Sequence, residues 1–292
     1  MCLSSVEGVE QALRGQAYLP DRGLATAVYL ALERQRPLLL EGEAGVGKTE
    51  LARTVARVLG ASLIRLQCYE GIDSGQALYD WDYPRQLLYA RAVQEGDFRH
   101  RLAELYGPEF LLERPLLKAI REECSVVLLI DELDRADDEF EAFLLEVLSD
   151  YTVTIPEIGT ISTANPPTVI ITSNRTRELH DALRRRCLFH WIEFPSVDRE
   201  EEIIRLRAPE VPDKLARSVA RAIARMRELD LIKMPGAAEA IDWAHALAVL
   251  GADAVTSEAA RVSLGWAVKN RDDLRRVEGV LHSLCDEECR DE

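Results

Sequence analysis

A glycine-rich stretch between two apolar segments, residues 36–53, constrains the fold of this chain more than any other feature. Within it, Gly42, Gly47, Lys48 and Thr49 match G-x-x-x-x-G-K-[ST], the phosphate-binding loop. Glycines let the backbone turn tightly, so that successive N–H groups point at phosphate oxygens, and the positive end of the following helix adds to this cradle. We expect Lys48 to reach the β- and γ-phosphates and the Thr49 hydroxyl to hold Mg²⁺.

The flanking sequence favours this interpretation over its alternative, a glycine-rich turn before an ordinary helix. Residues 38–40 form the apolar run expected of a buried parallel strand. After the loop, apolar residues recur at helical spacing until Gly60. The sequence therefore predicts a strand, a loop and a helix that together bind a nucleotide. Besides the four motif residues, the expected nucleotide-binding set comprises Glu43, Ala44, Gly45, Val46 and Glu50.

Composition and charge narrow the class of protein. A chain of 292 residues, 47% hydrophobic and 30% charged, can form one large domain or two smaller ones. It contains no run of about eighteen apolar residues, and its first residues lack the pattern of a secretory signal. We therefore expect a cytoplasmic protein without a membrane span. The net charge of −15 would repel a polyanion, which counts against a nucleic-acid partner.

The six cysteines are scattered along the chain, which is not the pattern of a disulfide framework. His282, Cys285 and Cys289 lie at near-helical spacing and could ligate a metal ion. We expect an acidic terminal helix there instead, because zinc ligands usually come as closely spaced pairs.

A second chemical motif lies at residues 126–132, where an apolar strand ends in Asp131 and Glu132. A strand that is apolar at every position is typical of the centre of a parallel sheet, and such sheets bind ligands at their carboxyl ends. Alone, this pattern could be a strand that leaves into an acidic turn. Together with the phosphate-binding loop, it predicts that Asp131 holds Mg²⁺ through its water shell and that Glu132 is the general base for an attacking water.

Two further groups follow these motifs. Residues 168–173 predict another buried strand, which ends at Asn174. An amide can donate and accept at once, so Asn174 suits a group that senses the γ-phosphate and places the water, although a lone Asn is more often a turn former. The triplet 184–186 consists of arginines on a short predicted helix. Such a triplet is usually a solvated face, but one arginine could stabilise the transferring charge in a neighbouring subunit.

The remaining segments before residue 195 fit an alternating α/β order. We expect helices over 23–34 and from 138, strands over 62–66 and 189–194, mainly helix over 85–122, and a projecting hairpin over 151–161.

Two sets of aromatic and apolar residues leave alternatives open. Tyr18 and Leu19, ahead of the loop, are expected to pack structurally, with an adenine pocket as the alternative. The aromatic residues between positions 69 and 83 could be exposed contact residues or the buried side of a long connection; they are Tyr69, Tyr79, Trp81 and Tyr83.

Pro195 marks the expected domain boundary, with an α/β nucleotide-binding core over residues 1–195 and an all-helical domain over residues 196–292. Asp198 and Glu201 resemble a capping box at the start of this second domain. Further on, three arginines recur at i, i+4 spacing, which predicts a solvated face or, alternatively, a surface for a partner; they are Arg217, Arg221 and Arg225.

Taken together, these motifs resemble the AAA+ ATPases and, within them, the MoxR family. A finer resemblance, to the CoxD-like carbon-monoxide-dehydrogenase maturation ATPases, depends on residues 63–71, 77–88, 110–117 and 172–183. The resemblance implies an α/β P-loop NTPase fold whose five-stranded parallel sheet is flanked by helices, followed by a C-terminal helical lid. It also implies a hexameric ring with ATP bound between subunits.

On this resemblance, Asn174 is the first sensor and Arg186 is the arginine finger that acts on the neighbouring subunit, with Arg185 as the alternative. The implied activity is hydrolysis of ATP to ADP and phosphate with Mg²⁺ as cofactor. Proteins of this kind remodel client proteins beside a von Willebrand factor A-domain partner. In the closest branch, the client is a molybdenum hydroxylase or carbon-monoxide dehydrogenase that awaits its metal centre. Residues 235–240 lack the second sensor arginine of many relatives, so we assign no residue to that role.

Two other functions stay open. A nucleic-acid-associated AAA+ motor subunit would need basic loops, whereas the segment between residues 69 and 83 is acidic. A nucleotide-controlled protein-binding switch would not need to hydrolyse ATP, whereas both Asp131 and Glu132 are present.

Overall fold

The computed structural model describes residues 3–92, 104–163 and 165–284. The chain divides into two compact units. The first comprises Met1–Ala12, Arg22–Glu41 and Leu51–His190, and the second comprises Leu13–Asp21, Gly42–Glu50 and Trp191–Glu292. The expected domain boundary at Pro195 stays a prediction.

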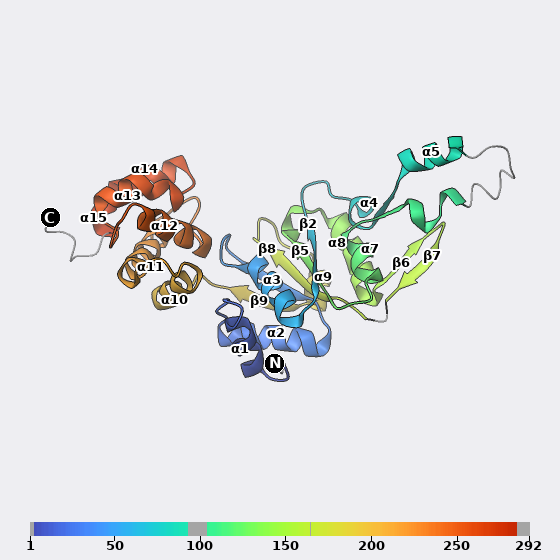
Figure 1. Cartoon of the computed structure of the whole chain (residues 1–292), viewed down its shortest axis with the longest axis horizontal. Coiled ribbons are helices and arrows are strands. Elements are labelled where there is room, and N and C mark those ends of the chain that lie inside the picture. Colours follow the sequence, from blue (N-terminus) through green and yellow to red (C-terminus); the bar gives the residue numbers. More distant parts are fainter. Residues whose placement is uncertain (1–2, 93–103, 164, 285–292) are drawn as a thin grey trace. The chain divides into compact units, whose positions relative to one another are not determined.

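A five-stranded parallel sheet forms the centre of the first unit, with strand order β2-β5-β8-β1-β9 (Figure 1). Its strands are β1 (Leu38–Gly42), β2 (Ser62–Gln67), β5 (Val126–Asp131), β8 (Thr168–Ser173) and β9 (Leu188–Ile192). The registers of β2 with β5, β5 with β8 and β8 with β1 are parallel. This sheet confirms the α/β expectation, and β9 lies within two residues of the strand predicted over 189–194.

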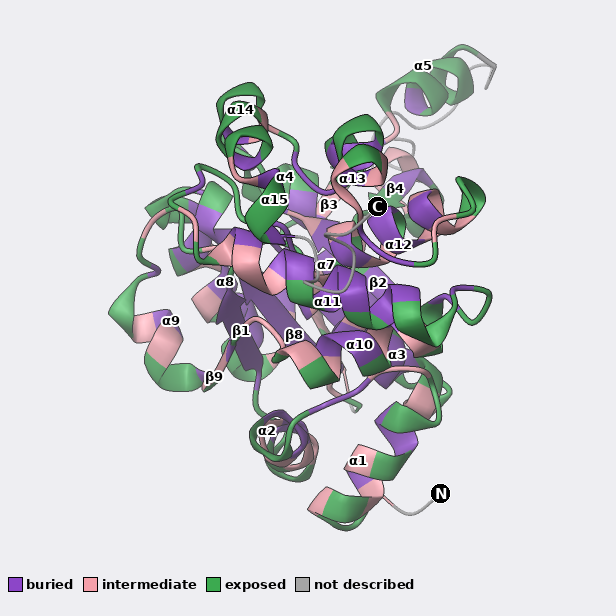
Figure 2. Cartoon of the chain, turned by 90° about the vertical axis from the view of Figure 1, so that its left-hand side faces the viewer, coloured by how far each residue is buried: buried purple, intermediate pink, exposed green. Residues whose placement is uncertain are grey.

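Both faces of this sheet are buried, which explains the continuous apolar runs in its central strands. Every residue of β1 and β5 is buried, and β1 and β8 are purple along nearly all their length in Figure 2. Leu39, Leu128 and Ile171 lie in one hydrophobic cluster with residues of α7 (Pro115–Arg121) and α8 (Asp138–Asp150). The next residue along each strand therefore points to the opposite face.

Helices and two short β-pairs complete the first unit. The remaining helices of this part of the chain are α1 (Val6–Arg14), α2 (Arg22–Arg34), α3 (Lys48–Leu59), α4 (Ser74–Ala77), α5 (Tyr83–Ala92) and α9 (Asp181–Arg186), with 3₁₀ turns at Pro108–Phe110 and Leu133–Arg135. The predicted hairpin is confirmed as β6 (Thr152–Ile155) paired with β7 (Gly159–Ser162). A second antiparallel pair, β3 (Tyr79–Trp81) with β4 (Leu111–Glu113), was not predicted; three-residue strands depend on a distant partner rather than on their own pattern.

The aromatic segment between residues 69 and 83 contains both buried and exposed rings, the two alternatives that the sequence left open. Trp81 is 7% exposed and packs edge-to-face against Tyr79 and Tyr106. Tyr69 and Tyr83 are exposed, and Tyr83 begins α5, which stands away from the sheet in Figure 1. The segment therefore anchors a short sheet to the core and leaves two rings on the surface.

From Val197 onward the second unit is helical, as predicted. Its helices are α10 (Val197–Arg207), α11 (Asp213–Arg227), α12 (Ala237–Val249), α13 (Ser257–Ser263), α14 (Arg271–Gly279) and α15 (Leu281–Leu284), with a 3₁₀ turn at Leu264–Trp266. The stripe predicted on α11 is fully buried and packs in one cluster with Trp243; it consists of Leu215, Val219, Ile223 and Met226.

The expected capping box at Asp198 and Glu201 is wrong. Ser196 caps α10, since its hydroxyl accepts a hydrogen bond from Arg199 N, which places Asp198 inside the first turn. Glu201 instead accepts two hydrogen bonds from Arg217, at 3.0 and 3.2 Å.

The arginine row on α11 is therefore engaged within the chain rather than bare. Besides the pairing of Arg217, Arg225 donates to the backbone oxygens of Ser283 and Leu284. Across the described parts of the chain, no helix has the length and apolar character needed to cross a membrane.

Candidate functional site

The predicted phosphate-binding loop connects β1 to α3 and folds around its own lysine. The Lys48 ammonium donates to Gly42 O at 2.6 Å and to Glu43 O at 2.7 Å. A side chain at position 42 is excluded, because its Cβ would lie 2.4 Å from Ile192 O. Gly45 has φ +79°, a conformation that side chains disfavour. The loop therefore has the backbone that an anion cradle needs, with the N-terminal end of α3 beside it.

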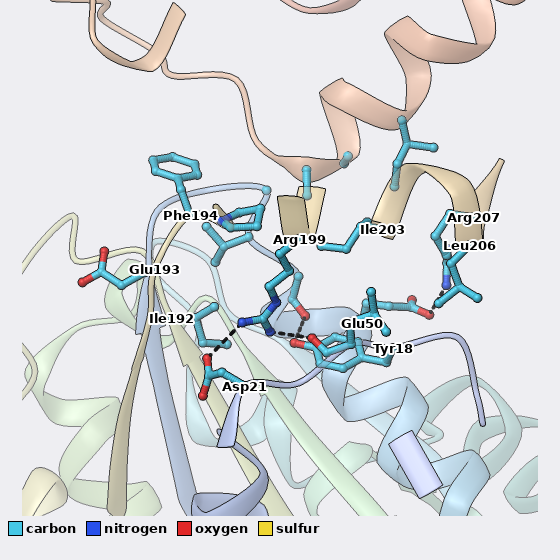
Figure 3. A pocket seen from close by; sticks show the side chains of 18 of the residues that line it. Tyr18, Asp21, Glu50, Ile192, Glu193, Phe194, Arg199, Ile203, Leu206 and Arg207 are labelled. Carbon is cyan, nitrogen blue, oxygen red and sulfur yellow. Dashed lines mark hydrogen bonds and ion pairs between the residues drawn. The ribbon is translucent and has the colours of Figure 1, made fainter. Parts of the chain in front are cut away.

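A cavity of about 420 Å³ lies beside this loop in the second unit (Figure 3). Val46, Ile192 and Ile241 contribute apolar side chains to its wall. Tyr18 and Leu19 also line it, and the Tyr18 hydroxyl donates to Gly47 O at 3.5 Å. Burial raises the pKa of Tyr18, so the phenol stays neutral and keeps its proton as a donor. The two residues that the sequence expected to pack structurally thus lie where the alternative, a base pocket, would place them.

Two arginines that the sequence did not single out fix the walls of the cavity. Arg199 donates to Leu19 O at 2.5 Å and pairs with Asp21 at 3.4 Å, and Arg207 pairs with Glu50 at 3.2 Å (Figure 3). The sequence gives no sign that these arginines of α10 line a cavity, because most arginines on helices are solvated. Only the tertiary structure identifies them.

The start of α12 lies directly against the loop. Ala237 N donates to Gly45 O at 3.0 Å, and the Glu239 carboxylate accepts from Gly236 N at 3.0 Å. A Cβ on Gly236 would lie 2.6 Å from the Gly45 Cα. The segment that lacks the second sensor arginine therefore contacts the loop through backbone atoms.

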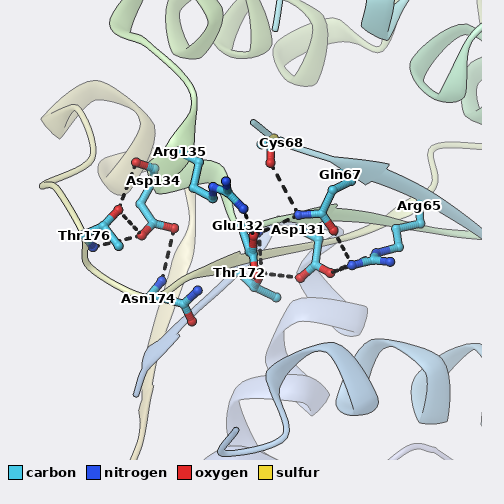
Figure 4. Close-up of polar contacts among 10 residues, drawn as sticks. All are labelled: Arg65, Gln67, Cys68, Asp131, Glu132, Asp134, Arg135, Thr172, Asn174 and Thr176. Atoms are coloured by element: carbon cyan, nitrogen blue, oxygen red, sulfur yellow. Dashed lines mark hydrogen bonds and ion pairs between the residues drawn. The ribbon is translucent and has the colours of Figure 1, made fainter. Parts of the chain in front are cut away.

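In the first unit, Asp131 and Glu132 lie at the carboxyl end of β5 (Figure 4). Asp131 is 2% exposed and accepts from the Thr172 hydroxyl at 2.6 Å and from Arg65 Nε at 2.9 Å. The same Thr172 hydroxyl accepts from Glu132 N at 2.9 Å. The Glu132 carboxylate accepts from Gln67 Nε2 at 3.0 Å. This network orients both acidic side chains from the neighbouring strands β2 and β8.

The chemistry of the expected donors fits Mg²⁺. A threonine hydroxyl and a carboxylate are hard oxygen ligands, which Mg²⁺ prefers, and it retains several water molecules when it binds to few protein groups. Thr49 of the second unit and Asp131 of the first unit each carry an oxygen donor of this kind.

Asn174 follows β8, as predicted, and a buried acid that the sequence did not identify fixes its backbone. Asp134 is 2% exposed and accepts from Asn174 N at 3.1 Å and from Thr176 N at 2.9 Å (Figure 4). The next residue, Arg175, has φ +57°, which is uncommon for a side chain of this size. The turn that presents the Asn174 amide is therefore held by Asp134, together with a local hydrogen bond from Arg175 N to the Ser173 hydroxyl at 3.0 Å.

The three arginines of α9 differ in what they contact. The Arg184 guanidinium lies 5.5 Å from the Phe189 ring centroid, and Arg186 Nη1 donates to Leu145 O at 2.9 Å. For the exposed Arg185 side chain, the described residues supply no hydrogen bond or ion pair. In this structure, then, the expected finger residue Arg186 is engaged with its own chain.

Of the C-terminal group His282, Cys285 and Cys289, only His282 lies among the described residues. His282 Nδ1 lies 3.4 Å from the Ser257 hydroxyl, whereas Cys285 and Cys289 lie outside the described residues. Residues 3–92, 104–163 and 165–284 contain no group of three His, Cys, Asp or Glu side chains arranged to hold a metal ion.

Comparison with known proteins gives one matching family and several similar proteins. A sequence profile of the AAA domain (dynein-related subfamily) matches residues 37–187. The chaperone MoxR1 of Mycobacterium tuberculosis is 28% identical over 202 residues, which are 67% of this chain and 45% of MoxR1. Midasin of Giardia intestinalis is 33% identical over 113 residues, 39% of this chain and 2% of midasin. The chaperone protein ClpB of Mycoplasma pneumoniae is 28% identical over 173 residues, 57% of this chain and 19% of ClpB.

The chain spans less than half the length of each of these relatives. Among solved structures, the Thermotoga maritima RuvB Holliday junction branch migration motor superposes with a TM-score of 0.49 at 19% identity, over 93% of this chain and 74% of RuvB. A likeness of this extent carries no inference about function.

Proposed function

This chain belongs to the AAA domain family, in its dynein-related subfamily, and we propose on that premise that it converts ATP and water to ADP and phosphate with Mg²⁺ as cofactor. The observation that carries the proposal is the cavity beside the loop. Its apolar wall suits the flat face of a base, and its glycine-lined end suits a chain of phosphates. Tyr18 and Leu19 contact the base in this arrangement.

In this proposal, the loop binds the phosphates of ATP, and Asp131 and Glu132 support its hydrolysis. Lys48 exchanges its bonds to Gly42 O and Glu43 O for the β- and γ-phosphates, with the backbone N–H groups of residues 43–47 around them. Thr49 and Asp131 would hold Mg²⁺, which would neutralise charge on the phosphates when bound. Glu132 takes a proton from the attacking water, whose oxygen bonds to the γ-phosphorus as the bond from that phosphorus to the β-γ bridging oxygen breaks.

Two residues complete the reaction. Asn174 places the water and senses the γ-phosphate, since its amide both donates and accepts. Arg186 stabilises the transferring charge in the neighbouring subunit of a hexameric ring, and Arg185 is the alternative. For Arg186 to act there, it must leave Leu145 O, so subunit contact and finger release would occur together.

We further propose that hydrolysis drives remodelling of a client protein, as the names of the chaperones MoxR1 and ClpB suggest for those relatives. The CoxD-like resemblance of residues 63–71 and 77–88 supports a client metalloenzyme of the molybdenum hydroxylase or carbon-monoxide dehydrogenase type. The resemblance to the MoxR family supports a von Willebrand factor A-domain partner. We also propose a cytoplasmic location. On this hypothesis, helices α10 to α15 form the C-terminal helical lid.

The test is affinity capture with Glu132→Gln and ATP, followed by identification of the proteins that co-purify. Loss of a general base should lower ATP turnover by about a hundredfold or more while nucleotide binding persists. A client should be retained by Glu132→Gln with ATP and released by the matched control Lys48→Ala, which lacks the phosphate contact.

Three outcomes would contradict parts of the proposal. Unchanged turnover in Glu132→Gln would remove the catalytic assignment. Capture of this chain alone, across conditions, would count against the remodelling function. DNA-stimulated turnover that falls steeply with salt would favour the nucleic-acid motor instead.

A further inference from the structure

Two side chains of β2 bind the two acidic residues that follow one another at the end of β5. Arg65 Nε and Nη2 both donate to the same oxygen of Asp131, Oδ2, at 2.9 and 2.5 Å. The Thr172 hydroxyl occupies the other oxygen, Oδ1. The Asp131 side chain is 2% exposed, whereas Arg65 is 45% exposed. A cation that solvent can reach thus covers one oxygen of a carboxylate that solvent cannot.

The same arginine is connected to Glu132 through one amide. Arg65 Nη2 also donates to the Gln67 side-chain oxygen, and Gln67 Nε2 donates to Glu132 Oε2 at 3.0 Å (Figure 4). Arg65 and Gln67 are two residues apart on β2, so both side chains point to one face of the sheet. Gln67 lies opposite Asp131 in the register of β2 with β5. The three contacts form one chain from Asp131 through Arg65 and Gln67 to Glu132.

Glu132 is held in a conformation that needs such support. Its φ is +56°, in the left-handed region, which non-glycine residues seldom adopt. Its N–H is bound by Thr172, and its Oε2 also accepts from Arg135 Nη1 at 3.0 Å. Glu132 Oε2 already accepts hydrogen bonds from both Gln67 and Arg135, so this oxygen is occupied by protein donors rather than open to a water molecule. The arrangement is therefore a resting one for a general base.

We propose that Arg65 is an internal substitute for the metal. Its guanidinium neutralises Asp131 until Mg²⁺ arrives, and its displacement then releases Glu132 from the hydrogen bond with Gln67. The proposal rests on the proposed function of Asp131 as a Mg²⁺ ligand. Mg²⁺ or its bound water and a guanidinium compete for the same Oδ2, and two cations repel at this separation. Arg65 can leave because its side chain is already half in solvent. Once it leaves, Gln67 loses the donor on its oxygen, and the long 3.4 Å contact of Gln67 Nε2 with Cys68 O is left to orient the amide toward Glu132.

This device couples metal arrival to activation of the base. Without Mg²⁺, Glu132 stays hydrogen-bonded to Gln67. With Mg²⁺, the same event that completes the metal site removes the Gln67 contact and leaves Glu132 Oε2 with Arg135 as its side-chain donor. Arg65 and Gln67 are in this sense positioning residues, since neither needs to touch the reacting atoms.

The test measures how strongly Mg²⁺ promotes binding of a fluorescent ADP analogue, as the ratio of its Kd in EDTA to its Kd in saturating Mg²⁺. In Arg65→Met, metal no longer has to displace a cation, so the ratio should rise about tenfold or more, the value of one charge-assisted hydrogen bond. Arg65→Lys keeps the charge without the two-point contact and should fall between. Gln67→Leu should leave the ratio within about twofold of wild type while it changes kcat, since it breaks the connection beyond Arg65.

The outcomes separate this proposal from the proposed function. Absence of any Mg²⁺-dependent nucleotide binding in the wild type would overturn both. A wild type that binds normally, with an unchanged or lower ratio in Arg65→Met and in Arg65→Lys, would overturn only the role of Arg65. A ratio that rises as much in Gln67→Leu as in Arg65→Met would overturn the order in which these contacts connect Asp131 to Glu132. Because the ratio compares two conditions for one variant, a general loss of stability in Arg65→Met does not change it, and Arg65→Lys provides the reading if Arg65→Met does not fold.

Discussion

Arg227 of α11 is buried and makes several contacts at once, which makes its removal a sharp test of the packing in the second unit. It donates to both carboxylate oxygens of Glu200, at 2.8 and 2.7 Å, and to Pro235 O at 2.8 Å. Its guanidinium carbon also lies 4.4 Å from the Phe194 ring centroid. The Arg227 and Glu200 side chains are 8% and 0% exposed.

We predict that Arg227→Met lowers the free energy of unfolding by about 3–5 kcal/mol at pH 8, because it leaves the Glu200 carboxylate buried without a counter-charge. The control is Arg14→Met. Arg14 pairs with Glu202 at 3.2 Å, but both side chains are about half exposed, at 43% and 55%, so this loss should cost about 0–1 kcal/mol. The double variant Arg227→Met/Glu200→Met removes both charges and should recover most of the loss.

The assay is urea unfolding followed by tryptophan fluorescence, since Trp243 is fully buried in the same cluster of helices. The three variants are compared by their midpoints at equal m-values. A loss for Arg227→Met that equals the Arg14→Met control would refute the reasoning. So would a double variant that is no more stable than Arg227→Met alone, because the cost would then not come from the orphaned carboxylate.

Three further predictions follow from the structure. Burial raises the pKa of Glu200 to about 6 from the ordinary 4.5, even beside Arg227, so the folded state holds this proton more tightly than the unfolded state. The stability that the bound proton contributes is complete below pH 4.5 and is lost as the pH rises through 6. The urea midpoint should therefore fall across that window relative to Glu200→Gln. Gly236→Ala should raise the Kd for ADP roughly tenfold, measured with a fluorescent ADP analogue, because the added methyl group would displace the backbone of Gly45. In the control Gly265→Ala, the added Cβ would meet open space, so the affinity should stay unchanged. Arg186→Ala should lower ATP turnover by about a thousandfold with ADP affinity retained, and Arg185→Ala should have a smaller effect; the opposite order would transfer the finger role to Arg185.

The sequence was informative wherever a pattern is local. Continuous apolar runs identified the central strands, because a strand covered on both faces has no polar side, and the glycine spacing identified the loop, because only glycine tolerates the approach of Ile192 O and the φ of Gly45. The i, i+4 stripe on α11 likewise predicted a buried face that the structure confirms.

The sequence was silent wherever a role depends on a distant partner. Nothing in the pattern of β2 distinguishes Arg65 and Gln67 from the polar residues of an edge strand, and only their register with β5 brings them to the acidic pair. Asp134 reads as one more acid in an acidic turn, yet it fixes the backbone of Asn174. The capping error at Asp198 has the same origin, since Glu201 is attracted to Arg217 on another helix.

The two short bonds that Lys48 makes to the carbonyls of its own loop have a kinetic consequence. A phosphate that enters the cradle must break both bonds before it gains the ammonium, and the loop can re-form them the moment a diphosphate begins to leave. Entry and departure then each exchange one set of acceptors for another, and the carbonyls of Gly42 and Glu43 act as a reversible stand-in for the ligand. A loop built in this way should exchange ADP for ATP by itself, without a second protein to eject the product.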